Sequence, residues 1–144
     1  MPIRKQEFYE GAALHVLAKS GLIRRVAHEP PLFIFNESIS VLIKYSTRGR
    51  SPGGFTFTTD EQLVIRCRST PHNFIIALAC GSDGIAAIPA TDYEAIALPR
   101  ENAIHIACYR DFGQQYSVKG PDGTLGYKVP PSAWERILEN GWRP

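Results

Sequence analysis

The sequence has few cysteines, no long apolar run and little excess charge, and each shortage excludes a class of protein. Its cysteines, Cys67, Cys80 and Cys108, are odd in number and widely spaced, which excludes a disulfide framework or a zinc site and indicates reduced, mostly buried thiols. No apolar segment approaches the roughly 18 residues that a membrane-spanning helix needs. The N-terminal MPIRKQEFYEG has no apolar block before a cleavage site. We therefore expect a cytoplasmic protein with no membrane partner.

What the sequence does contain is the composition of an ordinary globular domain. Its 144 residues are 44% hydrophobic and 21% charged, which argues against disorder and predicts one domain, residues 1–144, with a core of normal size. The formal net charge of +2 is too small to indicate a nucleic-acid partner by itself. Such a partner has to be inferred from the clustering of basic residues.

Helical and strand patterns alternate along the chain. Apolar spacing predicts a first helix over residues 6–19, with Phe8, Ala12 and Val16 on one stripe beside Ala13 and Leu17. Short apolar runs predict strands at 39–46, 74–80, 85–88, 103–109 and 116–119. The runs at 22–27 and 32–35 are two strands, or a strand and an extended arm. Capping-box spacing predicts further helices that begin near residues 58, 91 and 132. This order predicts an α/β fold with a mixed central sheet flanked by helices.

The segment ISVLIKYSTRGR, residues 39–50, ends a predicted strand in a cation and continues into a basic loop. Side chains alternate across a strand, so Ile39, Val41, Ile43 and Tyr45 share a core face while Lys44 ends the other, partly polar face. One interpretation places Lys44 at the edge of a cleft. The other is that its aliphatic stem lies along the end of a half-buried strand and its ammonium reaches solvent.

The acid-bearing helix segment EGAA (residues 10–13), followed by strands and by IKYST (residues 43–47), resembles the PD-(D/E)XK restriction-endonuclease-like superfamily. In that family the lysine lies two residues after a Glu, Asp or Gln, an aspartate lies on the preceding strand, and a helix glutamate often completes the site. The following strand and turn, NFIIALACGSDGIAAI, fit the same core. The resemblance covers roughly residues 6–88 and implies a restriction-endonuclease-like core.

Residue by residue, the resemblance makes Lys44 the family's lysine and Glu10 its helix acid. Leu42 occupies the acidic position two before the lysine and cannot hold a cation. The candidates for a carboxylate supplied from another element are Glu29, Glu37 and Asp60. An active enzyme would use Lys44, Glu10 and Glu29 with Mg²⁺ to hydrolyse phosphodiesters. Because of Leu42, we favour a degraded active site. The kinship requires that Lys44 and Glu10 share one concavity.

The loop at residues 46–54 places Ser46, Thr47, Arg48 and Arg50 beside Lys44, followed by two glycines. Arginine forks and glycine-rich backbone amides suit phosphate oxygens, so these residues are candidates for binding DNA or RNA. A solvated surface loop and a site for a small anion are the alternatives. The leading hypothesis is a nucleic-acid-binding nuclease-like protein, active or degraded, of a bacterial defence or mobile-element system.

A second hypothesis belongs to another functional class. The same scaffold would serve as a non-catalytic module for protein interaction or homodimerisation, through an aromatic C-terminal segment. That segment contains Trp134, Ile137, Leu138 and Trp142. The alternative for these side chains is that they pack the last helix onto the sheet, and only those left exposed would form a partner surface.

Overall fold

The computed structural model describes residues 2–19, 22–47, 53–67, 74–81, 84–111 and 113–140. Its helices are α1 (Lys5–Ala18), α2 (Thr59–Arg66), α3 (Ala90–Ile96) and α4 (Ala133–Asn140). Its strands are β1 (Val26–Glu29), β2 (Leu32–Phe35), β3 (Ile39–Ser46), β4 (Gly53–Phe57), β5 (Phe74–Cys80), β6 (Ile85–Pro89), β7 (Ile104–Tyr109), β8 (Ser117–Gly120) and β9 (Gly123–Thr124). None of the helices in these ranges combines the length and apolar character needed to cross a membrane.

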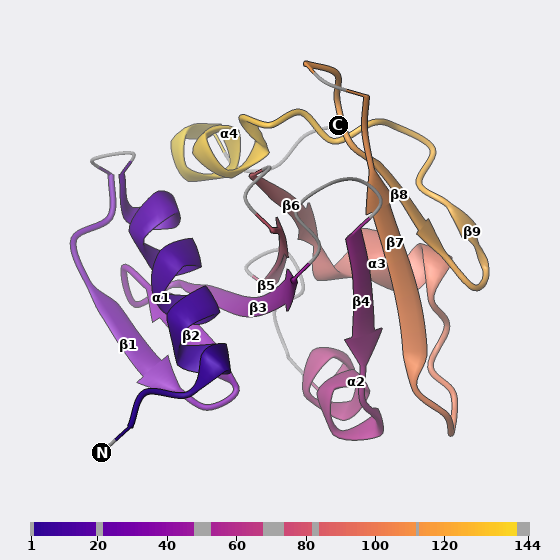
Figure 1. The fold of residues 1–144 in the computed structure, drawn as a ribbon, viewed down its shortest axis with the longest axis horizontal. Helices are drawn as coiled ribbons and strands as arrows, with labels where there is room; N and C mark the ends of the chain where they lie inside the picture. Colours follow the sequence, from indigo (N-terminus) through magenta and orange to yellow (C-terminus); the bar gives the residue numbers. More distant parts are fainter. Residues whose placement is uncertain are drawn as a thin grey trace.

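The strands form two sheets (Figure 1). The first sheet has the order β1-β2-β3-β5-β6, and the second has the order β4-β7-β8-β9. In the first sheet β1, β2 and β3 are antiparallel, β3 runs parallel to β5, and β6 returns antiparallel to β5. Every residue of β5 is buried, because both faces of the sheet are covered at this strand. The predicted mixed α/β architecture is confirmed, and the second, antiparallel sheet is an addition to it.

One face of the first sheet is covered by α1 and α4. Tyr9 of α1 stacks on Tyr45 of β3, with ring centroids 4.6 Å apart. Trp134 of α4 meets Phe35 of β2 edge-on at 5.2 Å, and its indole nitrogen donates to the carbonyl of Leu17 at 2.8 Å. The strand register puts Phe35 and Tyr45 on the same face. We call this the α1 face.

The opposite face carries Leu42 and Lys44, and we call it the Lys44 face. It looks toward β4 and α2, because the Lys44 ammonium lies 5.2 Å from the ring centroid of Phe57 on β4. The Phe57 ring in turn lies 4.8 Å from that of Tyr93 on α3. Lys44 therefore points into the layer between the two sheets.

The predicted apolar stripe of the first helix is partly wrong. Ala13 and Leu17 are buried, whereas Phe8 is 63% and Val16 is 45% exposed. Ala12 is exposed as well. The helix has two adjacent apolar edges, and the contacts of Tyr9 and Leu17 decide that the other edge faces the sheet.

Other local predictions have mixed outcomes. The predicted strand at 39–46 and the helix start at Thr58 are confirmed, since Thr58 Oγ1 accepts the amide of Glu61 at 3.2 Å. The predicted capping box at 91–94 is wrong, because α3 begins one residue earlier, with Pro89 as N-cap and no side-chain cap. The first strand begins at Val26 and not at residue 22.

Candidate functional site

Lys44 lies at the centre of the candidate site. Its Nζ donates to both carboxylate oxygens of Glu61, at 2.8 and 2.9 Å. Both side chains are only 18% exposed, and the ring of Phe57 lies against the ammonium. The lysine is therefore a partner in a half-buried, bidentate ion pair that joins β3 to α2.

The first turn of α2 positions Glu61. Thr58 caps the helix through the amide of Glu61, and the amide of Thr58 donates back to Glu61 Oε1 at 3.0 Å. This reciprocal capping box holds the glutamate at the helix N-terminus, which is a favourable place for a carboxylate. The capping spacing was visible in the sequence. That this acid meets Lys44 was missed, because it depends on how α2 docks beside β3.

Glu10, the predicted helix acid, is not brought to Lys44. It belongs to α1, whose Tyr9 stacks on Tyr45, and Tyr45 and Lys44 point to opposite faces of β3. Burial raises the pKa of Glu10, while a hydrogen bond from Gln6 and the charge of His28 oppose that rise. The predicted arrangement required the helix acid and the lysine to share one concavity. They do not share one.

The three candidates for a relocated carboxylate do not reach Lys44 either. Glu29 lies on the Lys44 face, but it belongs to β1. The strand β2 lies between β1 and β3, so β1 and β3 are about 10 Å apart. It lines an open concave surface with Ile34 and Glu37. Glu37 forms an exposed ion pair with Arg25, and Asp60 is exposed in the first turn of α2.

The predicted nucleic-acid-binding residues lie at and beyond the end of β3. Ser46 is buried and Thr47 is exposed. Arg48 and Arg50 lie outside the described residues. Leu42, two residues before Lys44 on the same face, is 1% exposed, so an apolar side chain occupies the family's acidic position.

The donor set around Lys44 does not fit Mg²⁺. This ion takes octahedral oxygen ligands and binds through carboxylates. Among the described residues Lys44 bonds the carboxylate of Glu61, and both oxygens of that carboxylate already accept from the ammonium. In the described ranges there is no cluster of three or more His, Cys, Asp or Glu side chains able to hold a metal. We therefore derive no chemical step through a metal at this site.

Tyr93 adds a buried phenol beside the ion pair. Its side chain is 2% exposed, and its hydroxyl has no partner among the described residues. Burial raises the pKa of Tyr93, the charges of Glu61 and Glu94 add to this, and Arg100 opposes it. The phenol therefore stays neutral at physiological pH and keeps this side of the pair poorly solvated.

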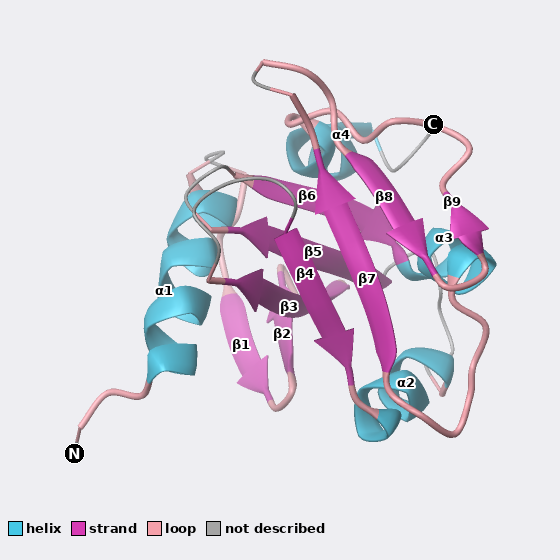
Figure 2. Ribbon diagram, turned by 45° about the vertical axis from the view of Figure 1, so that its right-hand side comes forward, coloured by secondary structure: helices cyan, strands magenta, loops and turns pink. Residues whose placement is uncertain are grey.

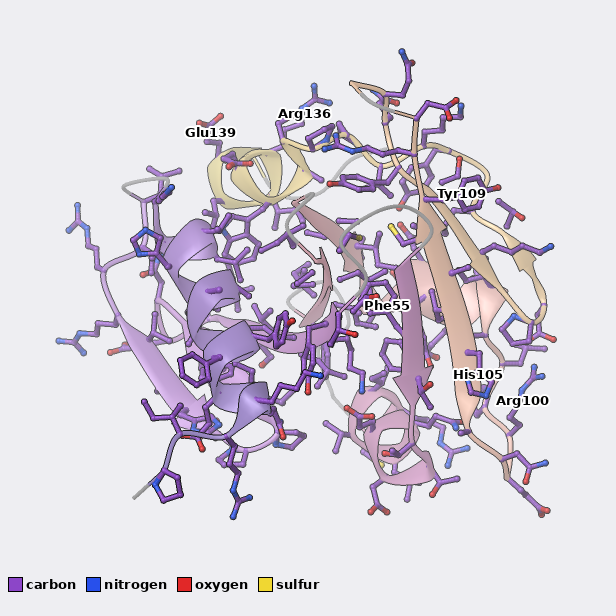
Figure 3. All side chains as sticks on the ribbon, in the orientation of Figure 1. Phe55, Arg100, His105, Tyr109, Arg136 and Glu139 are labelled. Atoms are coloured by element: carbon purple, nitrogen blue, oxygen red, sulfur yellow. The ribbon has the colours of Figure 1, made fainter. Side chains whose placement is uncertain are left out.

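The aromatic C-terminal segment is mostly a packing element. Trp134 is 3% and Ile137 is 7% exposed, so neither is available to a partner. Trp142 lies outside the described residues. On α4 the labelled side chains that project away from the body are Arg136 and Glu139 (Figure 3).

Comparison with protein-family models, with curated proteins and with solved structures found no match for this chain. The function therefore has to be inferred from the geometry of the chain's own residues.

Proposed function

We propose that this chain is a cytoplasmic nucleic-acid-binding protein in which Lys44 belongs to a structural ion pair and does not serve hydrolysis. The bidentate contact of Lys44 with Glu61, on the sheet face opposite Glu10, is the observation that carries this proposal.

The order of elements keeps one part of the resemblance, although Lys44 and Glu10 do not share the concavity that the kinship requires. A helix precedes three antiparallel strands, the third of which ends in Lys44, and α2 then leads to β5, which lies parallel to that strand. This is the order of helix, strands, lysine strand and following strand that the resemblance implies over residues 6–88. The strand β4 and the rest of the second sheet are additions to such a core.

The surroundings of Lys44 favour a structural role over hydrolysis. A nuclease lysine stabilises charge that develops on phosphate, so its ammonium has to face the substrate. Here the ammonium is held by both oxygens of Glu61, beneath the ring of Phe57 and beside the apolar Leu42. A phosphate would have to break this pair in a poorly solvated layer, which costs several kcal/mol.

Nucleic-acid binding is supported by the chain that follows the lysine strand. Ser46 and Thr47 end β3 and lead into the sequence Arg48-Gly-Arg50. Arginine guanidinium groups bind phosphate oxygens in a fork, and such contacts are independent of base sequence. We therefore expect binding that depends strongly on salt.

The test is binding of single-stranded and duplex DNA and RNA between about 50 and 200 mM salt, with cleavage assayed in Mg²⁺ and Mn²⁺. We expect salt-sensitive binding without cleavage, and a loss of affinity in the double variant Arg48→Ala, Arg50→Ala. The matched control is Arg136→Ala, which removes an exposed arginine of α4 (Figure 3). Absent or salt-independent binding would overturn the binding role, and cleavage that Lys44→Met abolishes would overturn the structural role of the lysine.

A second candidate function, homodimerisation, is favoured by the exposed edge of α1. Phe8 and Val16 are 63% and 45% exposed, and a Cβ added to Gly11 between them would meet no described atom within 4 Å. An exposed apolar edge of this kind is typical of an interface. Light scattering of the wild type and of Phe8→Asp tests it, with the 57% exposed Leu98 changed to Asp as control. A monomeric wild type would remove this candidate.

A further inference from the structure

The second sheet has an open outer side, which we call the outer face. It carries Thr56 and Gly54 of β4, His105, Ala107 and Tyr109 of β7, and Lys119 of β8. In β4 and β7 these residues alternate with buried neighbours, which face the layer between the sheets. No helix lies in front of this sheet in Figure 2.

The outer face is flat at its centre. Gly54 is paired with Ala107, and Ala107 is paired with Lys119 on its other side. A Cβ added to Gly54 would meet no described atom within 4 Å, so nothing in the described chain requires this glycine. The two small residues, Gly54 and Ala107, leave room for a planar group to approach the backbone.

Two larger groups flank this flat row along β7. Tyr109 is 42% exposed, and it lies two residues beyond Ala107 on the same side of the strand. His105 lies two residues before Ala107 and is held by Thr56, whose hydroxyl is 3.1 Å from its Nδ1. In Figure 3 Tyr109 and His105 occupy opposite ends of β7 on the open side of the sheet.

The strands of this face carry a lysine and no carboxylate. The sequences of β4, β7, β8 and β9 are GGFTF, IHIACY, SVKG and GT, and they contain Lys119 and His105 but no acidic residue. The nearest acids along the chain, Asp111 and Asp122, lie beyond the strand ends, and the carboxylate of Asp122 is bound to Arg100. The face is thus complementary to an anionic ligand.

We propose that the outer face binds single-stranded nucleic acid, with a base stacked on Tyr109 and phosphates beside Lys119 and His105. An exposed aromatic ring on a cationic, otherwise flat surface suits bases that are free to leave the stack. A duplex keeps its bases stacked on one another, and no helix projects from this face to enter a groove. The inference rests on the proposed nucleic-acid binding. It adds which surface binds and that the bound nucleic acid is single-stranded.

The experiment measures the affinity of the full chain for labelled oligo(dT), oligo(U) and a mixed-sequence duplex. We expect single strands to bind more tightly than the duplex. Tyr109→Ala should weaken single-strand binding by about 5- to 150-fold, the range for loss of one stacked base. Tyr109→Phe should retain binding because the ring remains. Lys119→Glu should weaken binding and reduce the slope of log K against log salt by at least about 0.7, while Lys128→Glu, at another exposed lysine, should have a smaller effect.

The outcomes separate this inference from the function on which it rests. If the chain binds nucleic acid but Tyr109→Ala and Lys119→Glu bind as the wild type does, the outer face is not the site and the proposed function stands. Preference for the duplex also overturns the inference alone. Absence of binding to every probe overturns the proposed function and this inference with it. Because Tyr109 and Lys119 are exposed, an unchanged melting temperature will confirm that the variants are folded.

Discussion

Replacing Lys44 with methionine tests whether the ion pair at the end of β3 is structural. The substitution removes the ammonium and keeps an apolar stem of similar length beside Phe57. It leaves the carboxylate of Glu61 only 18% exposed, with the amide of Thr58 as its remaining donor among the described residues. The partner substitution, Glu61→Gln, removes the negative charge and keeps an oxygen that can accept from Thr58, so the helix cap is retained.

The expected magnitude follows from the burial of the pair. Removing one partner of a fully buried pair costs about 3–5 kcal/mol, and exposed pairs contribute about 0–1 kcal/mol. With both side chains 18% exposed, we expect Lys44→Met to lower the free energy of unfolding by about 2–3 kcal/mol. At roughly 4 °C per kcal/mol for a domain of this size, the melting temperature should fall by about 8–12 °C.

The assay is a double-mutant cycle by urea and thermal unfolding. We expect Lys44→Met together with Glu61→Gln to be less destabilising than the sum of the single changes by about 1–2 kcal/mol, because no unpaired charge remains. The matched controls are Lys128→Met and Asp60→Asn, which remove exposed charges and should change stability by less than about 1 kcal/mol. A coupling energy below about 0.5 kcal/mol would refute the structural role of the pair.

Three further predictions concern other positions. Burial raises the pKa of Glu10 above 4.5, so the folded state holds this proton more tightly than the unfolded state does. The free energy of unfolding should therefore fall as pH rises through the raised pKa. The variant Glu10→Gln should remove this fall in urea titrations from pH 4 to 7. Tyr93→Phe removes a buried hydroxyl that lacks a described partner. The free energy of unfolding, measured with urea, should therefore stay the same or rise by up to about 1 kcal/mol. A fall of more than about 1 kcal/mol would mean that the hydroxyl is hydrogen-bonded. Gly120→Ala would place a Cβ 2.3 Å from the carbonyl oxygen of Ile96, so it should cost more than about 2 kcal/mol in thermal unfolding, whereas Gly126→Ala, whose Cβ would meet no described atom within 4 Å, should cost little.

Local features of the fold were predictable because neighbouring residues decide them. The apolar alternation over residues 39–46 gives β3, and the Thr58–Glu61 spacing gives the start of α2. The Asn36-Glu37 turn before β3 is also a local feature, and both residues adopt positive φ, 52° and 61°. In each case the residue pattern that indicates the element lies within a short stretch of sequence.

The edge of α1 that faces the sheet was not predictable in this way. The stripe of Phe8, Ala12 and Val16 fits a helical period as well as the edge of Ala13 and Leu17 does. Contacts with distant residues decide between them. The Leu17 carbonyl accepts from Trp134, more than a hundred residues later in the chain.

The sequence by itself determined that a strand carries Lys44 near its end, that the two faces of this strand differ, and that a helix begins near Thr58. Only the tertiary structure decided which acid meets the lysine. Glu61 bonds its ammonium, while Glu10 lies on the opposite face of the sheet. Alternation along a strand assigns side chains to faces, but the packing of segments distant in sequence decides which helix covers each face.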